Sequence, residues 1–444
     1  MKKDEEQAKS DFKSSLKTTG LFGGVQVFKI LLSIISNKFI AILLGPTGMG
    51  IAGMFGQTTG LISNVSGLGL GTSAVRDLSS SYSTGDKNHY FHTLSVFRRL
   101  VWATGMLGLL ICLLGAPFWS KICFGDGHYT WAFALLSLTI LLGQVSGGQG
   151  VIMQTSRNFK MMAKSGIIGS VLGTVTSIPL YFAFGINGIV PAIMLSSVLS
   201  IALTTYFAHK IPQKDIKVTL REVLSDGHTM LTLGFFIMLQ GFMNLLCAYL
   251  IRIYISRTGS LADVGMYSAG FSVINAYVGT VFSSMGTEYY PRLSTYANDT
   301  EKFNQAVNQQ MEISLLLTAP LIAMFLTFGD LVVVIFYSKE FLPIAWMINW
   351  AILAIFFRAP SWCLGFTFMA KGDTKAFWIN EFFGDFTMLV CNVIGYTTLG
   401  LTGLGVSFLV SYIIYLTQNM VVTHFRYKFA LDLRLLRAFV HQLA

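Results

Sequence analysis

HKIPQKDIKVTLREVLSDGH, residues 209–228, is the longest polar stretch near the middle of an otherwise strongly apolar chain. On both sides of it, apolar runs of about 20 residues, the length that crosses a bilayer, follow one another closely. We expect membrane-spanning helices near 21–44, 50–74, 97–118, 131–153, 166–184, 188–208, 231–251, 265–287, 313–336, 344–369, 380–398 and 402–422. The polar stretch therefore separates six predicted helices from six.

The composition agrees with a chain that lies mostly in lipid. Hydrophobic residues make up 53% of the sequence, charged residues only 12%, and the mean hydropathy is +0.61. A soluble protein carries about 25% charged residues. The composition thus excludes an ordinary soluble domain and indicates an all-α polytopic membrane protein.

The positive charges predict the orientation of the helices. If the N-terminus is cytoplasmic, 24 of the 31 lysines and arginines fall in cytoplasmic segments and only 4 in outer ones. An even number of helices with both termini in the cytoplasm follows. The net charge of +10 then reflects topology, and no nucleic-acid partner is expected.

This reading divides the chain into five parts. We expect a cytoplasmic segment (1–20), a six-helix bundle (21–208), a cytoplasmic linker (209–230), a second six-helix bundle (231–422) and a cytoplasmic tail (423–444). Residues 1–20 lack the apolar core and cleavage site of a signal peptide, so the first apolar run is expected to remain as a helix. The tail fits an amphipathic helix on the inner leaflet, and equally a packed or frayed terminal helix.

A shift of 215 residues aligns the two halves without a gap. The matched pairs include Gly50 with Gly265, Tyr181 with Tyr396, Gly185 with Gly400 and Gly188 with Gly403. The number of identities is near chance, but several fall at matching helix ends. Six helices return the chain to the same side, so a duplication predicts two parallel bundles around a central cavity.

Polar residues recur along one face of the first predicted helix and of its counterpart. Spacing of three to four residues places a side-chain stripe on one helix face. The predicted substrate-binding residues of these two helices are Gln26, Lys29, Ser33, Asn37, Gln240 and Asn244. For Lys29, a side chain that snorkels to the membrane surface is the alternative.

Arg358 lies in the middle of the tenth predicted helix, shortly before Pro360, whose missing N–H allows a local break. A guanidinium at this depth suits an anionic group such as a pyrophosphate, which it can bind with two hydrogen bonds. An ion pair with Asp385 is the alternative reading. Asp385 is also the candidate for coupling to Na⁺ or H⁺.

The sequence contains no motif for catalysis or for a bound cofactor. The five cysteines are scattered without a CxxC pair or a nearby histidine at ligand spacing, so no metal site is expected. A phosphate-binding loop and a nucleophile motif are also absent. We therefore expect a transporter driven by an ion gradient, the membrane potential or consumption of its cargo.

The run LLGPTGMGIAGMFGQTTGLISNVSGLGLGTSAVRD (43–77) resembles the start of Wzx-type translocases for O-antigen and enterobacterial common antigen. Segments 263–294 and 371–382 show similar correspondences. The resemblance implies the multidrug/oligosaccharidyl-lipid/polysaccharide (MOP) exporter superfamily and a bacterial inner-membrane flippase. The implied cargo is an undecaprenyl-pyrophosphate-linked oligosaccharide, with membrane lipid around it and polysaccharide polymerases as possible partners. The matched residues are packing glycines, so no substrate contacts are carried over.

Two other functions are weighed against this one. An ion-coupled drug or metabolite exporter of the same superfamily commonly needs an acid in the first helix, where residues 21–44 contain lysines instead. A membrane glycan polymerase or ligase needs a sizeable outer loop, whereas the predicted outer connections are short.

Overall fold

The computed structural model describes residues 2–83, 86–214 and 216–432, which are helical throughout with short connections and contain no strand. Side chains at 2–23, 83, 220, 240, 276–278, 280, 281, 283, 284 and 287 lie outside the description. The predicted all-α class is confirmed. The α-helices are α1 (Lys2–Gly67), α2 (Leu70–Ser83), α3 (Lys87–Leu114), α4 (Ala116–Phe124), α5 (Thr130–Thr155), α6 (Phe159–Phe184), α7 (Ile189–Ala208), α8 (Leu220–Asp226), α9 (His228–Thr258), α10 (Leu261–Thr295), α11 (Thr300–Phe336), α12 (Ile344–Ala370) and α13 (Thr374–Tyr427).

The chain forms two compact units. Unit 1 consists of Met1–Leu44 and Met54–Leu246, and unit 2 of Gly45–Gly53 and Cys247–Ala444. The predicted linker 209–230 belongs to unit 1, and the boundary between the units falls inside α9. Of the predicted tail, residues 433–444 lie outside the described part of the chain.

Eight helical segments of the described residues are long and apolar enough to cross a bilayer. Three of them, Gly24–Gly67, Phe159–Ala208 and Thr374–Tyr427, are 44, 50 and 54 residues long. Each is long enough for two crossings of about 20 residues. The chain is therefore a multi-pass membrane protein, while the count of twelve helices stays a prediction.

Glycines with positive φ divide these three long segments. Gly45 (φ 65°) breaks α1 directly before Pro46. Gly185 (φ 55°, ψ −133°) separates α6 from α7 through the 3₁₀ turn Gly185–Gly188, and Gly400 (φ 59°, ψ −138°) breaks α13. Only glycine adopts these torsions without strain. Because Gly185 and Gly400 are 215 residues apart and share one conformation, they support the predicted duplication.

The second predicted helix ends earlier than expected. Instead of continuing to residue 74, α1 ends at Gly67, because Leu68 (φ 46°) and Gly69 (φ 62°) both take left-handed torsions. A Cβ at Gly69 would lie 2.2 Å from the carbonyl oxygen of Gly234 on α9. The break lets α9 pass close to this turn, and the chain continues in α2.

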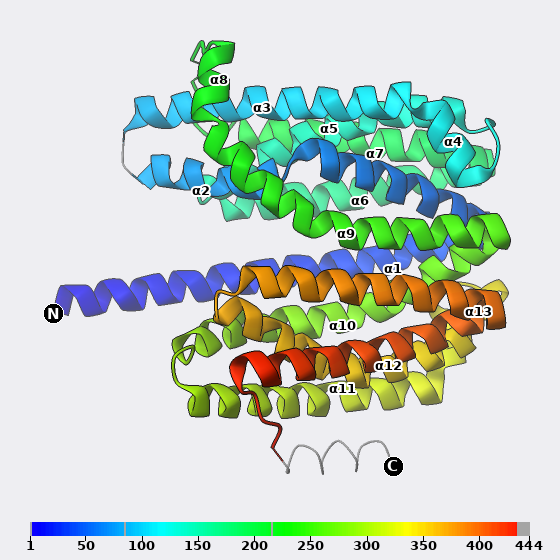
Figure 1. Cartoon of the computed structure of the whole chain (residues 1–444). Coiled ribbons are helices and arrows are strands. Elements are labelled where there is room, and N and C mark those ends of the chain that lie inside the picture. Colours follow the sequence, from blue (N-terminus) through cyan, green and yellow to red (C-terminus); the bar gives the residue numbers. More distant parts are fainter. Residues whose placement is uncertain (1, 84–85, 215, 433–444) are drawn as a thin grey trace. The chain divides into compact units, whose positions relative to one another are not determined.

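In unit 1, α3, α5 and α7 run side by side (Figure 1). Their facing sides bury large apolar residues, and their glycines allow close approach, as at Gly148, where a Cβ would lie 3.1 Å from Val101. The core of unit 1 includes Leu94, Phe97, Leu100, Leu141, Val145, Ile152 and Phe207. These three helices form a packed framework for unit 1.

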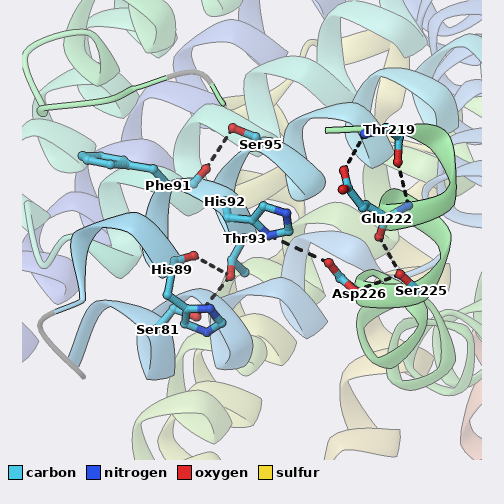
Figure 2. Close-up of polar contacts among 10 residues, drawn as sticks. All are labelled: Ser81, His89, Phe91, His92, Thr93, Ser95, Thr219, Glu222, Ser225 and Asp226. Carbon is cyan, nitrogen blue, oxygen red and sulfur yellow. Dashed lines mark hydrogen bonds and ion pairs between the residues drawn. The ribbon is translucent and has the colours of Figure 1, made fainter. Parts of the chain in front are cut away.

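The polar stretch 209–228 folds back onto the start of α3 (Figure 2). The backbone N–H of Ile216 donates to Oγ of Ser95 at 3.0 Å, and Nδ1 of His92 lies 3.9 Å from the carboxylate of Asp226. Val223 of α8 is buried in the unit 1 core. The stretch is therefore held by specific contacts to unit 1.

In unit 2, α12 packs against α10, α11 and α13. Its most apolar window is 61% buried, the highest share among the candidate spans of the described residues. The helix continues through Pro360 without a break, unlike the local interruption expected from the sequence. Arg358 therefore projects from a straight run of the helix at the centre of unit 2.

Candidate functional site

The predicted stripe of α1 belongs to unit 1. Gln26, Lys29 and Ser33 are exposed and Asn37 is half-buried. This part of α1 also exposes several apolar side chains, and the most apolar window of Gly24–Gly67 is only 11% buried. The stripe is thus available to a ligand as far as the packing within unit 1 decides it.

Lys29 lies across α6 at a glycine. A Cβ built at Gly166 would be 3.1 Å from Nζ and 3.2 Å from Cε of Lys29. Gly166 therefore leaves the space that the lysine chain occupies. Among the described residues, no hydrogen bond or ion pair of Lys29 is found, so its charge is available to an anion.

The predicted pair on α9 is divided by what the structure describes. Asn244 is exposed and belongs to unit 1, whereas the side chain of Gln240 lies outside the described residues. Between them, Gly241 faces α1, where a Cβ would lie 3.2 Å from Nδ2 of Asn64. The structure thus brings this part of α9 to the second half of α1.

Arg358 of unit 2 is held by neutral groups. Its Nη1 donates to Oδ1 of Asn275 on α10 at 3.0 Å. The guanidinium carbon lies 5.5 Å from the ring centre of Tyr412 and 5.9 Å from that of Phe282. Where the sequence left an ion pair with Asp385 as the alternative, the structure gives the guanidinium an amide oxygen and two aromatic rings.

Two carboxylates follow one another on α13. Asp385 is half-buried, and Glu381 lies one helical turn before it on the same face. The hydroxyl of Tyr415 donates to Oε1 of Glu381. Asp385 also lies within electrostatic range of Tyr412, one of the rings beside Arg358. The arginine and the acids therefore belong to one polar region of unit 2.

Glu381 is the residue that sequence reasoning missed, because its position suggested a solvated helix end. The structure places it half-buried within a membrane-spanning segment. The spacing of Glu381 and Asp385, four residues apart in an apolar window, was the available signal.

Buried amides hold this region together. Nδ2 of Asn380 donates to Oδ1 of Asn419 at 2.7 Å, and Nε2 of Gln418 donates to Oδ1 of Asn380 at 2.8 Å. Nδ2 of Asn419 reaches the carbonyl oxygen of Ser361, three residues after Arg358, at 3.4 Å. The network thus connects both halves of α13 to the part of α12 that carries Arg358.

The comparisons with known proteins identify the family. The chain matches the model of a family described as polysaccharide biosynthesis protein over residues 39–346, more than half of its length. The chain belongs to this family. The resemblance noted in the sequence is thereby confirmed.

Two curated relatives of this family member have related functions. It is 23% identical over 351 residues to a protein of Shigella flexneri described as an O-antigen transporter, covering 78% of this chain and 82% of that one. It is 22% identical over 372 residues to a lipid III flippase of Escherichia coli K12, covering 82% and 86%. These names confirm the expectation of a transporter rather than an enzyme.

Solved structures show the same fold. A lipid II flippase, MurJ, in an inward closed conformation matches with a TM-score of 0.75 at 16% identity, covering 95% of this chain and 90% of that one. An inward-facing multidrug resistance MATE family transporter of the MOP superfamily matches with 0.69 at 17% identity, covering 91% and 94%. The fold of this family member is that of MOP-superfamily transporters.

Proposed function

We propose that this protein flips an undecaprenyl-pyrophosphate-linked oligosaccharide from the cytoplasmic to the periplasmic leaflet of the bacterial inner membrane. Its curated relatives are described as an O-antigen transporter and a lipid III flippase, which supports this class of cargo. Both termini are then cytoplasmic, as the distribution of positive charge predicts. Transport proceeds by alternating access.

The observation that carries this proposal is the environment of Arg358. A guanidinium within an apolar segment is costly unless it has a function or a compensating charge. Here it donates to the neutral Oδ1 of Asn275 and lies over aromatic rings. Its planar N–H groups suit a pyrophosphate, which can accept two parallel hydrogen bonds.

The stripe of α1 supplies complementary chemistry in unit 1. Lys29 offers a second cation, and Gln26, Ser33 and Asn37 offer donors and acceptors for sugar hydroxyls. Asn244 and Gln240 have the same hydrogen-bonding chemistry on α9. These residues are our candidates for contacts to the oligosaccharide and its pyrophosphate.

Coupling to Na⁺ or H⁺ is assigned to Asp385, with Glu381 as its neighbour. Two carboxylates one turn apart in an apolar segment can share a proton or bind a cation, because the repulsion between two charges disfavours double ionisation. Polysaccharide polymerases that extend the flipped units are the proposed protein partners.

Binding of the cargo tests the proposal. We would titrate the purified protein with undecaprenyl-pyrophosphate oligosaccharide and with the same oligosaccharide on undecaprenyl monophosphate, and follow the complexes by native mass spectrometry. Tighter binding of the pyrophosphate, reduced in Arg358→Gln, supports the assignment. Equal binding of both lipids by the wild type would contradict it.

An ion-coupled exporter of drugs or metabolites is the second candidate, favoured by the carboxylate pair Glu381 and Asp385. Such a protein would bind organic cations at least as well as pyrophosphate lipids. Competition by a cationic dye in the same titration separates the two functions.

A further inference from the structure

A pocket of ≈ 580 Å³ opens in unit 1, where α3, α5 and the end of α7 meet. Its volume lies within the range of about 300–1,000 Å³ that small-molecule sites occupy. Buried apolar side chains and a glycine form part of its lining. The lining residues are Phe97, Arg98, Arg99, Val101, Trp102, Val145, Gly148, Gln149, Ile152 and His209.

The polar groups of this pocket favour an anion. Arg98 is half-buried and Arg99 exposed, and no aspartate or glutamate is among the lining residues. Nδ1 of His209 lies 3.0 Å from the carbonyl oxygen of Thr205, so this nitrogen carries the proton and Nε2 is left for another partner. Two adjacent guanidiniums can bind one phosphate group with several charge-assisted hydrogen bonds.

Gln149 adds a second requirement for the ligand. Its Oε1 is buried and has no hydrogen-bond partner among the described residues. A buried acceptor left unpaired is costly, so a ligand that donates a hydroxyl hydrogen here would remove that cost. The pocket therefore suits a group that contains both a phosphate and a hydroxyl.

The surface beside the pocket indicates that this group is attached to a lipid. Trp102, Met106, Leu107 and Leu110 are each about half exposed and lie on one face of α3. This apolar face starts at the pocket and continues along a candidate membrane span. A tryptophan at the junction is typical of a membrane interface. Acyl chains can lie on this face while the headgroup occupies the pocket.

We infer that the pocket binds the headgroup of an anionic phospholipid with a free hydroxyl, such as phosphatidylglycerol. Arg98 and Arg99 bind its phosphodiester, and the headgroup hydroxyl donates to Oε1 of Gln149. The site uses none of the residues assigned to the cargo, so it stands or falls independently of the proposed function. The lipid would hold α3 and α5 together at this membrane surface.

Native mass spectrometry of the full-length protein in detergent tests this site. Three lipids with the same acyl chains are compared: phosphatidylglycerol, phosphatidylethanol, which has the same charge but no hydroxyl, and zwitterionic phosphatidylcholine. We expect phosphatidylglycerol to bind most tightly and phosphatidylcholine most weakly. Arg98→Gln and Arg99→Gln should each weaken phosphatidylglycerol about tenfold, the loss of one charge-assisted contact.

Variants of single groups locate the contacts. Gln149→Leu should abolish the preference for phosphatidylglycerol over phosphatidylethanol and leave the preference for charge. Lys160→Gln is the matched control, because Lys160 is an exposed cation outside the pocket and should not affect binding. Arg99→Lys, which keeps the charge, and equal thermal midpoints show that a weakened variant is still folded.

Three outcomes would overturn the inference. The first is equal binding of phosphatidylcholine and phosphatidylglycerol. The second is an equal effect of Lys160→Gln and Arg99→Gln. The third is release of phosphatidylglycerol by millimolar inorganic phosphate or by undecaprenyl pyrophosphate in preference to phosphatidylethanol, which would assign the pocket to free phosphate or to the cargo.

Discussion

Gly50 and Gly265 lie at a helix crossing in unit 2 that leaves no room for a Cβ at either position. A Cβ at Gly50 would be 1.9 Å from the carbonyl oxygen of Leu261, and a Cβ at Gly265 would be 1.9 Å from that of Pro46. The shift of 215 residues that relates Gly50 to Gly265 also relates Pro46 to Leu261. The two contacts are therefore equivalent by the internal repeat, which makes this crossing a direct structural sign of duplication.

Replacing either glycine should destabilise unit 2. Gly50→Ala and Gly265→Ala force two backbones apart, and overpacking of this kind costs about 1–3 kcal/mol. Gly56→Ala is the control, because a Cβ at Gly56 meets no atom within 4 Å. Thermal unfolding in detergent measures the difference. Equal midpoints for Gly50→Ala and Gly56→Ala would disprove the close crossing.

Moving Lys29 without removing its charge should impair transport. In Gly166→Val the new side chain occupies the space of Nζ and Cε of Lys29, so the ammonium must move. We expect the transport rate to fall towards that of Lys29→Ala, with an unchanged thermal midpoint. Gly169→Val is the control on the same helix, since a Cβ there makes only an ordinary contact at 3.7 Å. A wild-type rate in Gly166→Val would show that the position of Lys29 is unimportant.

Giving Arg358 an acidic partner should inhibit binding of the cargo. Asn275→Asp places a carboxylate at the oxygen that now accepts from Nη1, and the resulting ion pair competes with an anionic ligand. Asn275→Ala leaves the guanidinium unpaired and should bind pyrophosphate lipid at least as well as the wild type. Affinities from the lipid titration decide this. Similar affinities for the two variants would contradict a role of the arginine charge.

The buried amide network should contribute strongly to stability. Asn419 is fully buried, and Asn419→Leu leaves Nδ2 of Asn380 without its acceptor. An unsatisfied buried donor costs about 1–3 kcal/mol. The exposed Thr417→Val, which removes only a bond to its own helix, should cost much less. Thermal midpoints of the two variants test the difference, and a larger loss in Thr417→Val would refute it.

The ion pair at the start of α13 should make stability depend on pH. The side-chain hydrogen bond from Arg426 lowers the pKa of Asp373, and the backbone N–H of Ala376 contributes. A lowered carboxyl pKa stabilises the folded state above the unfolded value of about 3.9, and this stability is lost as the pH falls through the folded pKa. Asp373→Asn should therefore lower the thermal midpoint at pH 7 and have a diminishing effect below pH 4. A constant difference at both pH values would exclude this linkage.

The helices could be predicted from sequence because the requirements of lipid are local. Apolar runs of sufficient length predicted the spans, and the turn at Gly45 and Pro46 matches a break in α1. The end of α1 at Gly67 could not be predicted, because it depends on the approach of α9 to Gly69.

The candidate site was predicted less completely, because its contacts join residues that are distant in sequence. The cation at Arg358 could be recognised from its depth in an apolar run. Its partner Asn275 lies 83 residues away, and Tyr415, the partner of Glu381, lies 34 residues away. Periodicity along one helix contains no information about such pairs, so the arginine was recognised and its surroundings were not.

Leaflet exchange in proteoliposomes tests the central claim most directly. Purified protein would be reconstituted with a fluorescent undecaprenyl-pyrophosphate oligosaccharide, and exchange would be measured for the wild type, Lys29→Ala, Arg358→Ala and empty liposomes, with and without an ion gradient. We predict exchange well above that of empty liposomes for the wild type, and slower exchange in both variants at unchanged thermal midpoints. Wild-type exchange no faster than in empty liposomes, under either condition, would contradict the assignment as a flippase of this lipid.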